Sequence, residues 1–209
     1  MRMTEWYRLF RENSLKKVFT FDDLHVLTGL PTRELKVELS RLVKRGLAER
    51  LAKGIYANPF NYPSPAEIAM VLRPPCYISM EYCLSEEGIL SQHSFTVTCV
   101  TLGTPGTAHT SRTIFEYHRI ARKLFWGWRE DGQGVRWAWP EKALLDLIYI
   151  RHLRTRELSR ERLLSLLDDM YLEELNSERL LEFLSRFGSP HAEKIADILT
   201  KAGLAVTPS

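Results

Sequence analysis

Long apolar runs and paired cysteines are both missing from the 209-residue sequence. No stretch of about 18 apolar residues could span a bilayer, and the opening segment MRMTEWYRLFREN carries too many charges for the apolar part of a secretory signal. We therefore expect a cytoplasmic protein with no membrane partner. The cysteines Cys76, Cys83 and Cys99 form no Cys-x-x-Cys pair, which argues against a disulfide framework or a zinc knuckle. We expect them to be small buried apolar residues.

Catalytic patterns are also scarce. There is no P-loop and no Gly-x-Ser-x-Gly, and Gly188-Ser189 lacks the following Asp-x-Asp of a nucleotide-transfer site. Three histidines lie apart from one another without carboxylates at metal-ligand spacing: His93, His109 and His118. We therefore expect no enzyme activity, no metal site and no cofactor.

Positive charge is concentrated at the start of the chain. Residues 1–62 contain 12 lysines and arginines against 7 acidic residues, a balance of +5, whereas the whole chain carries only +3. The remainder is therefore slightly acidic. This asymmetry favours a polyanionic partner for the first 62 residues, and chance surface charge is the alternative.

Within that basic part, Thr20-Phe21-Asp22-Asp23 has the pattern of a capping box and predicts the start of a helix. We expect Leu24, Leu27 and Val26 to form its inner face. Gly29-Leu30-Pro31 should end it after about two turns, because glycine accepts the left-handed terminal geometry and the residue before proline resists the helix.

A second helix is predicted from Thr32 to Arg45. Four apolar positions share one sector at about 100° per residue: Leu35, Leu39, Leu42 and Val43. Its opposite face is basic and carries small residues. Gly46 should end it, and residues 47–51 and 55–57 can pair as a hairpin around Lys53-Gly54.

With a first helix over Trp6 to Asn13, this order of elements predicts a winged helix-turn-helix that binds double-stranded DNA. Arg33 is expected at base edges and Lys53 at the DNA backbone or a minor groove. The expected DNA-binding residues are Thr32, Arg33, Lys36, Val37, Ser40, Arg41, Lys44, Arg50 and Lys53. Val37 could meet a thymine methyl group or be an ordinary apolar surface residue, and winged helices also serve as protein-binding modules.

Asn61-Tyr62-Pro63-Ser64-Pro65 marks a seam between domains. Ser64 and Glu67 form a second capping box, which opens a helix that Pro74-Pro75 ends, and Ser79 can cap a further short helix closing at Gly88. Beyond it, strands are predicted over residues 95–102, 114–120 and 135–139, in a small mixed or antiparallel sheet.

Four of the five tryptophans alternate along one predicted hairpin: Trp126, Trp128, Trp137 and Trp139. They are expected to stack across strands on one face. Such ladders usually belong to a core, and a platform for bases or a partner is the alternative.

Helices should form the rest of the chain. PEKALLDLIYIRHL is apolar nearly all round and should be buried, with Asp146 and His152 as a structural salt bridge. Helical patterns follow from Ser159, and Ser189-Pro190 starts the last helix. The fold class is therefore α+β. We expect a winged helix-turn-helix over residues 1–62, a mixed α/β domain with a small sheet over 63–156, and a helical extension packed on it over 157–209.

Three segments together resemble a known family: FTFDDLHVLTGLPTRELKVELSRLVKRGLAERLAKGIYANP, SPAEIAMVLRPPCYISMEYCLSEEGIL and RWAWPEKALLDLIYI. They are similar to the AbiEi antitoxins of bacterial abortive-infection toxin–antitoxin systems, which act in phage defence. The resemblance implies an N-terminal domain that binds the protein's own promoter and represses it. It also implies a C-terminal domain that opposes a nucleotidyltransferase-like toxin encoded beside it, either by contact with the toxin or through the toxin's target. The positions that match in the second part are Tyr77, Ser79, Glu81, Lys142 and Asp146.

Two other functions remain open on the sequence. The chain could be a winged-helix transcription factor that senses a small ligand through its aromatic-rich part and has no connection with a toxin. It could also act on nucleic acid or a nucleotide, with Asp146 required for turnover.

Overall fold

The structure is a computed structural model that describes residues 1–204, and it divides into two compact units. The first unit comprises residues 1–68 with 109–112, and the second comprises residues 69–108 and those from 113 onward. All three cysteines are buried free thiols, as expected. No helix within residues 1–204 is long and apolar enough to cross a membrane.

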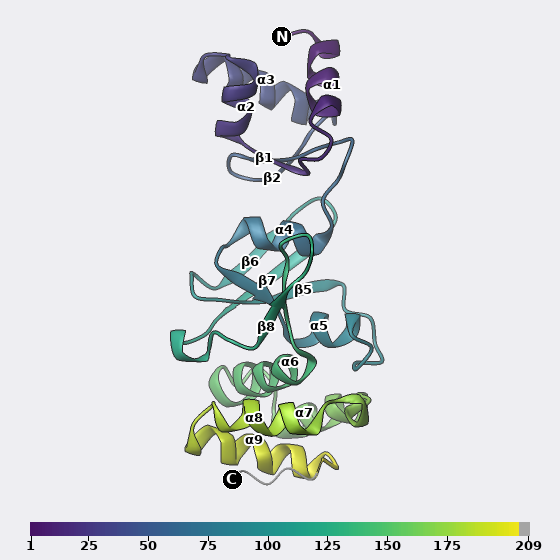
Figure 1. Cartoon of the computed structure of the whole chain (residues 1–209), viewed down its shortest axis with the longest axis vertical. Helices are drawn as coiled ribbons and strands as arrows, with labels where there is room; N and C mark the ends of the chain where they lie inside the picture. The colour runs from purple at the N-terminus through teal and green to yellow at the C-terminus, as the bar shows by residue number, and fades with distance from the viewer. Residues whose placement is uncertain (205–209) are drawn as a thin grey trace. The chain divides into compact units, whose positions relative to one another are not determined.

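The first unit has the predicted winged helix-turn-helix order (Figure 1). Its elements are α1 (Met3–Glu12), β1 (Val18–Thr20), α2 (Phe21–Thr28), α3 (Thr32–Lys44), β2 (Glu49–Ala52) and β3 (Ile55–Ala57). The strands form an antiparallel sheet in the order β1-β3-β2. The hairpin β2–β3 was predicted, whereas the three-residue strand β1 was not.

The ends of α2 follow from local chemistry. The Asp23 amide donates to the Thr20 hydroxyl over 3.1 Å, and the Thr20 amide donates to the Asp23 carboxylate over 2.7 Å, which confirms the capping box. Gly29 ends the helix at φ 64°, in the left-handed region.

The expected inner face of α2 was wrong for two of its three residues. Leu24 is fully buried, but Val26 is 80% exposed and Leu27 is 44% exposed. Val26 lies about 200° around the helix from Leu24, so a helix that packs by one side cannot bury both. The core of the unit draws only Leu24 from α2, and its other members come from α1, β1, α3 and the hairpin with the residue before it: Trp6, Phe10, Phe19, Leu24, Leu35, Leu39, Leu42, Ala48 and Tyr56.

Asn58 closes the first unit at the end of the wing. Its buried amide donates to the carbonyls of Phe10, Asn13 and Lys16, and its carbonyl accepts from the Phe60 amide. One side chain thereby satisfies backbone groups of the α1–β1 connection that lie more than 40 residues away in sequence. Its role depends on tertiary contacts, and no sequence pattern indicated it.

The second unit contains a six-stranded mixed sheet, in the order β6-β7-β5-β4-β9-β8. Its strands are β4 (Cys76–Ile78), β5 (Thr96–Thr101), β6 (Gly106–His109), β7 (Ile114–Arg119), β8 (Trp128–Glu130) and β9 (Arg136–Ala138). The three predicted strands correspond to β5, β7 and β9. β5 runs parallel to β7 and antiparallel to β4, whereas β4 and β9 are parallel.

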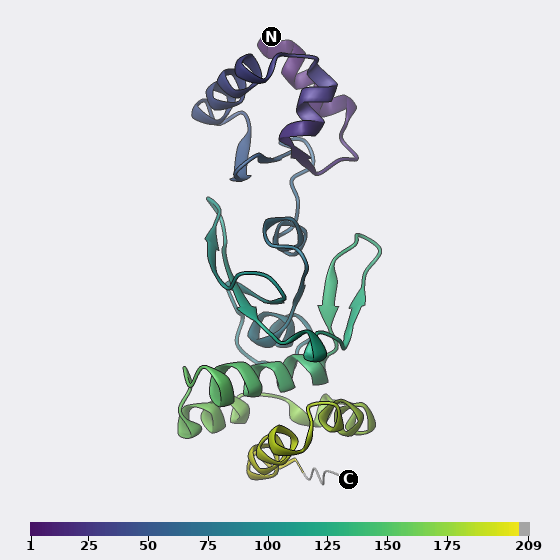
Figure 2. The ribbon, with the colours of Figure 1, turned by 90° about the vertical axis from the view of Figure 1, so that its left-hand side faces the viewer.

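The helices of this part of the chain begin with α4 (Pro65–Leu72) and α5 (Met80–Glu86). The Ser64–Glu67 capping box of α4 is present, with hydrogen bonds of 2.8 and 3.3 Å. The buried helix α6 (Pro140–Leu147) continues into a π-helical turn over Ile148–Arg154. It lies between the sheet and the last helices, α7 (Arg160–Asp168), α8 (Ser177–Ser185) and α9 (Ser189–Lys201) (Figure 2).

The expected tryptophan ladder was wrong. In the β8–β9 hairpin, Trp128 pairs with Ala138 and Trp137 pairs with Arg129. In this register, even-numbered residues of both strands face one side of the hairpin and odd-numbered residues face the other. Trp126 and Trp128 therefore cannot share a face with Trp137 and Trp139. The side chains pack separately instead. The Trp126 ring contacts Phe183 edge-on, whereas Trp137 stacks on Tyr82.

Candidate nucleic-acid interface

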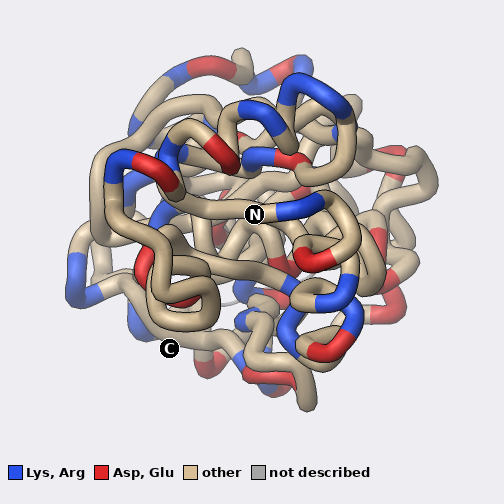
Figure 3. Tube along the Cα trace, turned by 90° about the horizontal axis from the view of Figure 1, so that it is seen from above, with Lys and Arg blue, Asp and Glu red and all other residues tan. Residues whose placement is uncertain are grey.

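Helix α3 presents its outer face because its inner face is anchored. Leu35, Leu39 and Leu42 are at most 3% exposed, and they hold the helix against the core of the first unit. The preceding turn, with Gly29 in the left-handed region, lets α3 start directly after α2. The lysines and arginines of this helix and of the β2–β3 hairpin are among those marked along the trace in Figure 3.

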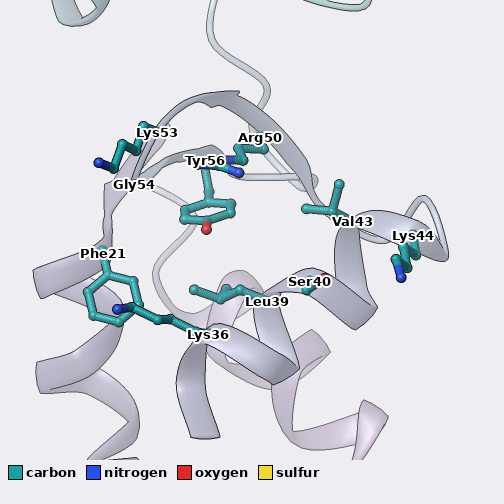
Figure 4. A pocket seen from close by; sticks show the side chains of 10 residues that line it. All are labelled: Phe21, Lys36, Leu39, Ser40, Val43, Lys44, Arg50, Lys53, Gly54 and Tyr56. Atoms are coloured by element: carbon teal, nitrogen blue, oxygen red, sulfur yellow. The ribbon is translucent and has the colours of Figure 1, made fainter. Parts of the chain in front are cut away.

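A groove of about 670 Å³ lies between α3 and the β2–β3 hairpin (Figure 4). Its lining consists of Phe21, Lys36, Leu39, Ser40, Val43, Lys44, Arg50, Lys53, Gly54 and Tyr56. Five of the nine expected DNA-binding residues are therefore brought together there: Lys36, Ser40, Lys44, Arg50 and Lys53.

The other four expected residues lie outside this groove. Thr32 and Arg33 are exposed at the first turn of α3, and Val37 is 45% exposed on the same helix. Arg41 forms an ion pair with Glu38 over 2.8 Å and lines a separate small pocket beside α1. The structure thus places Arg41 apart from the groove.

The apolar floor of the groove was not foreseen as part of the site. Leu39 and Val43 come from the inner edge of α3, Phe21 from the start of α2, and Tyr56 from β3. The helical period had placed Leu39 and Val43 toward the interior, which is correct for the fold. Tyr56 and Phe21 could be found only from the pairing of the hairpin with the rest of the unit.

The groove is cationic. Four of its lining residues are lysine or arginine and none is acidic. Among residues 1–204, Lys36, Lys44 and Lys53 have no ion-pair partner, and the Arg50 guanidinium donates only to the Ala52 carbonyl, over 3.1 Å. Gly54, at φ 76°, allows the tight turn that carries Lys53. Unpaired cations on both walls attract phosphate groups.

The comparison with known families agrees with this geometry. The model of a family described as "Transcriptional regulator, AbiEi antitoxin" matches residues 7–59, which contain α2, α3 and the whole hairpin. Residues 7–59 are an AbiEi-family regulatory domain. This family consists of DNA-binding regulators of toxin–antitoxin systems, as the sequence resemblance predicted.

A solved structure supports the fold beyond the AbiEi-family domain. The chain is similar to the crystal structure of the RV2827C protein from Mycobacterium tuberculosis, with a TM-score of 0.57 and 15% sequence identity. The similarity covers 95% of this chain and 76% of that one. At this identity it shows a shared fold only. No curated protein matches the chain.

Downstream of the AbiEi-family domain, four of the five motif positions form one buried cluster. Asp146 on α6 accepts hydrogen bonds from the hydroxyls of Tyr77, at 2.8 Å, and Ser79, at 2.9 Å. Lys142, one turn earlier on α6, pairs with the Asp146 carboxylate and donates to the Tyr77 hydroxyl over 3.0 Å. Burial raises the pKa of Tyr77 well above its usual value, and Asp146 raises it further. Burial also lowers the pKa of Lys142, against the attraction of Asp146.

The cluster corrects two expectations. Ser79 precedes α5, but its hydroxyl donates to Asp146 and makes no capping hydrogen bond to that helix. Asp146 pairs with Lys142 and not with His152, whose Nδ1 lies 2.9 Å from the Leu158 carbonyl oxygen. The i,i+4 spacing brings Lys142 onto the same side of α6 as Asp146. The two hydroxyls come from Tyr77 in β4 and from Ser79, the residue directly after that strand.

The fifth motif position, Glu81, belongs to a different group. It accepts hydrogen bonds from Arg151, which also pairs with Glu116 and Glu157. Arg151 lies on the π-helical turn and is held by three carboxylates from three separate segments. Within residues 1–204, no group of three or more His, Cys, Asp or Glu side chains is arranged to hold a metal ion.

Proposed function

We propose that the protein is a cytoplasmic autorepressor and antitoxin. It binds the promoter of its own operon and neutralises a nucleotidyltransferase-like toxin encoded beside it. The observation that carries the DNA-binding part is the cationic groove between α3 and the hairpin, within a domain of the AbiEi family. The proposed division is residues 1–62 for DNA binding, 63–156 for the antitoxin domain and 157–209 for a helical extension packed on it.

The proposed docking places α3 in the major groove. Thr32 and Arg33, at its exposed first turn, would meet base edges, because an arginine there can donate two parallel hydrogen bonds to guanine. Ser40 and Lys44 would contact phosphates farther along the helix. Lys53, at the hairpin tip, would meet the backbone or an adjacent minor groove.

The second unit would carry the antitoxin function, but not through the buried cluster. The side chains of Tyr77, Ser79, Lys142 and Asp146 are fully buried, so none of them can contact a toxin from this conformation. We propose that they stabilise the domain and that a surface of the same unit acts on the toxin. No catalytic activity is part of this proposal.

Binding to the protein's own promoter tests the first half. The affinity of the full chain should fall steeply with salt, with a logarithmic slope of roughly four to eight, because each neutralised phosphate releases counterions. An unrelated duplex of equal length is the control and should bind more weakly at every salt concentration. Binding that is absent, or that does not change with salt, would exclude the DNA-binding proposal.

Co-expression with the neighbouring reading frame tests the second half. Growth should be restored by the full chain, and co-purification would distinguish contact with the toxin from action on its target. A variant with Arg33→Ala and Lys53→Ala, which weakens the proposed DNA contacts, should still restore growth. Failure of the wild-type chain to restore growth would exclude the antitoxin function without affecting the promoter result.

A further inference from the structure

The groove between α3 and the hairpin has two layers of different chemistry. Its floor is formed by Phe21, Leu39, Val43 and the ring of Tyr56, whereas lysines and an arginine stand around it. The phosphate groups of DNA need only the cations, because a phosphate has no apolar part. The floor therefore suits a ligand with an apolar part of its own.

Tyr56 gives the floor a specific polar group. The residue is only 7% exposed, and its hydroxyl has no hydrogen-bond partner among residues 1–204. Figure 4 shows the ring lying inside the groove with the hydroxyl directed toward Leu39 on the opposite wall. The buried polar side-chain atoms without a partner in residues 1–204 are those of Trp6 and His25, so the Tyr56 hydroxyl is not among them but is open to the groove. It can therefore hydrogen-bond to a molecule that enters.

Two of the unpaired lysines flank this position from different elements. Lys36 extends from α3 and Lys53 from the hairpin tip, and both lie on the same side of the Tyr56 ring in the view of Figure 4. No carboxylate lines the groove. The ligand that matches this arrangement carries a negative charge close to its apolar ring.

We propose that the groove binds a small aromatic carboxylate. The ring would pack on Phe21, Leu39 and Val43, and the carboxylate would accept a hydrogen bond from the Tyr56 hydroxyl and pair with Lys36 or Lys53. A volume of about 670 Å³ is in the range of small-molecule sites. The site is distinct in place from the aromatic-rich hairpin of the second unit.

Such a ligand would also control DNA binding, and this part rests on the proposed function. Lys36 and Lys53 cannot pair with a carboxylate and with DNA phosphates at the same time. Ligand and DNA would therefore compete, each lowering the apparent affinity of the other as its own concentration rises above its Kd. The protein would release its promoter when the aromatic acid accumulates.

Calorimetric titration of the full chain with 2-naphthoate tests the site, with the neutral 2-naphthamide as the matched probe. We expect saturable binding of the acid with a Kd of roughly 10 µM to 1 mM, and binding of the amide weaker by about tenfold. Absence of saturation up to about 10 mM acid, or equal binding of acid and amide, would overturn the proposal.

Variants locate the ligand within the groove. Tyr56→Phe keeps the ring and removes the hydroxyl, so it should weaken 2-naphthoate binding about threefold to tenfold. Lys36→Met should have an effect of the same order, whereas Lys194→Met, on the exposed face of α9, should have none. Unchanged binding in both groove variants would show that the acid binds elsewhere and would overturn the site.

Promoter titrations with and without saturating 2-naphthoate test the competition. The apparent affinity for DNA should fall at least about fivefold. If the acid binds and the DNA affinity does not change, the competition is excluded. If the chain binds no DNA at all, the proposed function fails, while the calorimetry still decides whether the carboxylate site exists.

Discussion

Lys142 and Asp146 lie one turn apart on α6 and form an ion pair whose two side chains are completely buried. Removing one partner would leave an uncompensated charge in the interior. We expect Lys142→Met and Asp146→Leu each to lower the free energy of unfolding by about 3–5 kcal/mol. Chemical denaturation of the full chain followed by circular dichroism measures this.

The double variant separates pairing from packing. Because both charges are removed together, Lys142→Met with Asp146→Leu should be more stable than either single variant. Asp197 and Lys201 on α9 form an exposed pair at the same spacing and serve as the control. Asp197 also pairs with Arg160 on α7, but all three side chains are exposed, so small effects are expected. A double variant less stable than both single variants would contradict the structural role proposed for the cluster.

Gly127 packs directly against this ion pair. A Cβ at this position would lie 2.9 Å from Lys142 Cγ, and the backbone has φ +77°. The lysine cannot move aside, because its ammonium group is fixed by Asp146. Gly127→Ala should therefore destabilise the chain by about 2–4 kcal/mol in thermal or chemical unfolding. Gly132→Ala, where no atom lies within 4 Å, should be nearly neutral. Equal destabilisation by Gly127→Ala and Gly132→Ala would contradict the predicted clash with Lys142.

Asp23 makes the stability of the first unit depend on pH. Burial acts to raise its pKa, but hydrogen bonds from Lys16 and Thr20 lower the pKa below its usual value of 3.8. Because the folded pKa is the lower one, the stabilisation is complete above about pH 4 and is lost as the pH falls through the folded pKa.

Asp23→Asn should therefore lower the free energy of unfolding by about 1 kcal/mol at neutral pH. The difference in free energy of unfolding between this variant and the wild type should become smaller in acid. Urea unfolding at several pH values between about 2 and 7 measures both quantities. Asp22→Asn removes a carboxylate from the same turn but outside the capping box, and it is the matched control. If the difference in free energy of unfolding stays constant down to pH 2, the charge of the Asp23 carboxylate does not contribute to stability.

The parts of this fold that sequence could predict are those fixed by local chemistry. Thr20 with Asp23 and Ser64 with Glu67 specify helix starts within four residues, and the period of α3 identifies its inner side. These signals do not depend on what the helix packs against. These signals were sufficient to predict the order of elements in the winged helix, and through it five of the residues that line the groove.

The missed features depend on residues far apart in the chain. The strands β1 and β4 have only three residues each, so their pairing and not their composition defines them. Lys142 and Asp146 have the i,i+4 spacing of an ordinary solvent-exposed ion pair on a helix. Their burial follows only from the sheet that packs beside α6. Tyr56 likewise becomes part of a groove only when the hairpin folds over α3.

Two substitutions in the first unit separate base reading from backbone contact. Arg33 is exposed at the first turn of α3, whereas Lys53 lies at the hairpin tip. Arg33→Ala should cost about 1–3 kcal/mol for the best promoter sequence and relax the preference among sequences. Lys53→Ala should weaken all duplexes alike and reduce the salt slope by about one, because it removes one phosphate contact. Competition binding against a panel of operator variants at several salt concentrations distinguishes the two patterns. If both variants lose affinity equally for every sequence, α3 does not lie with its first turn in the major groove.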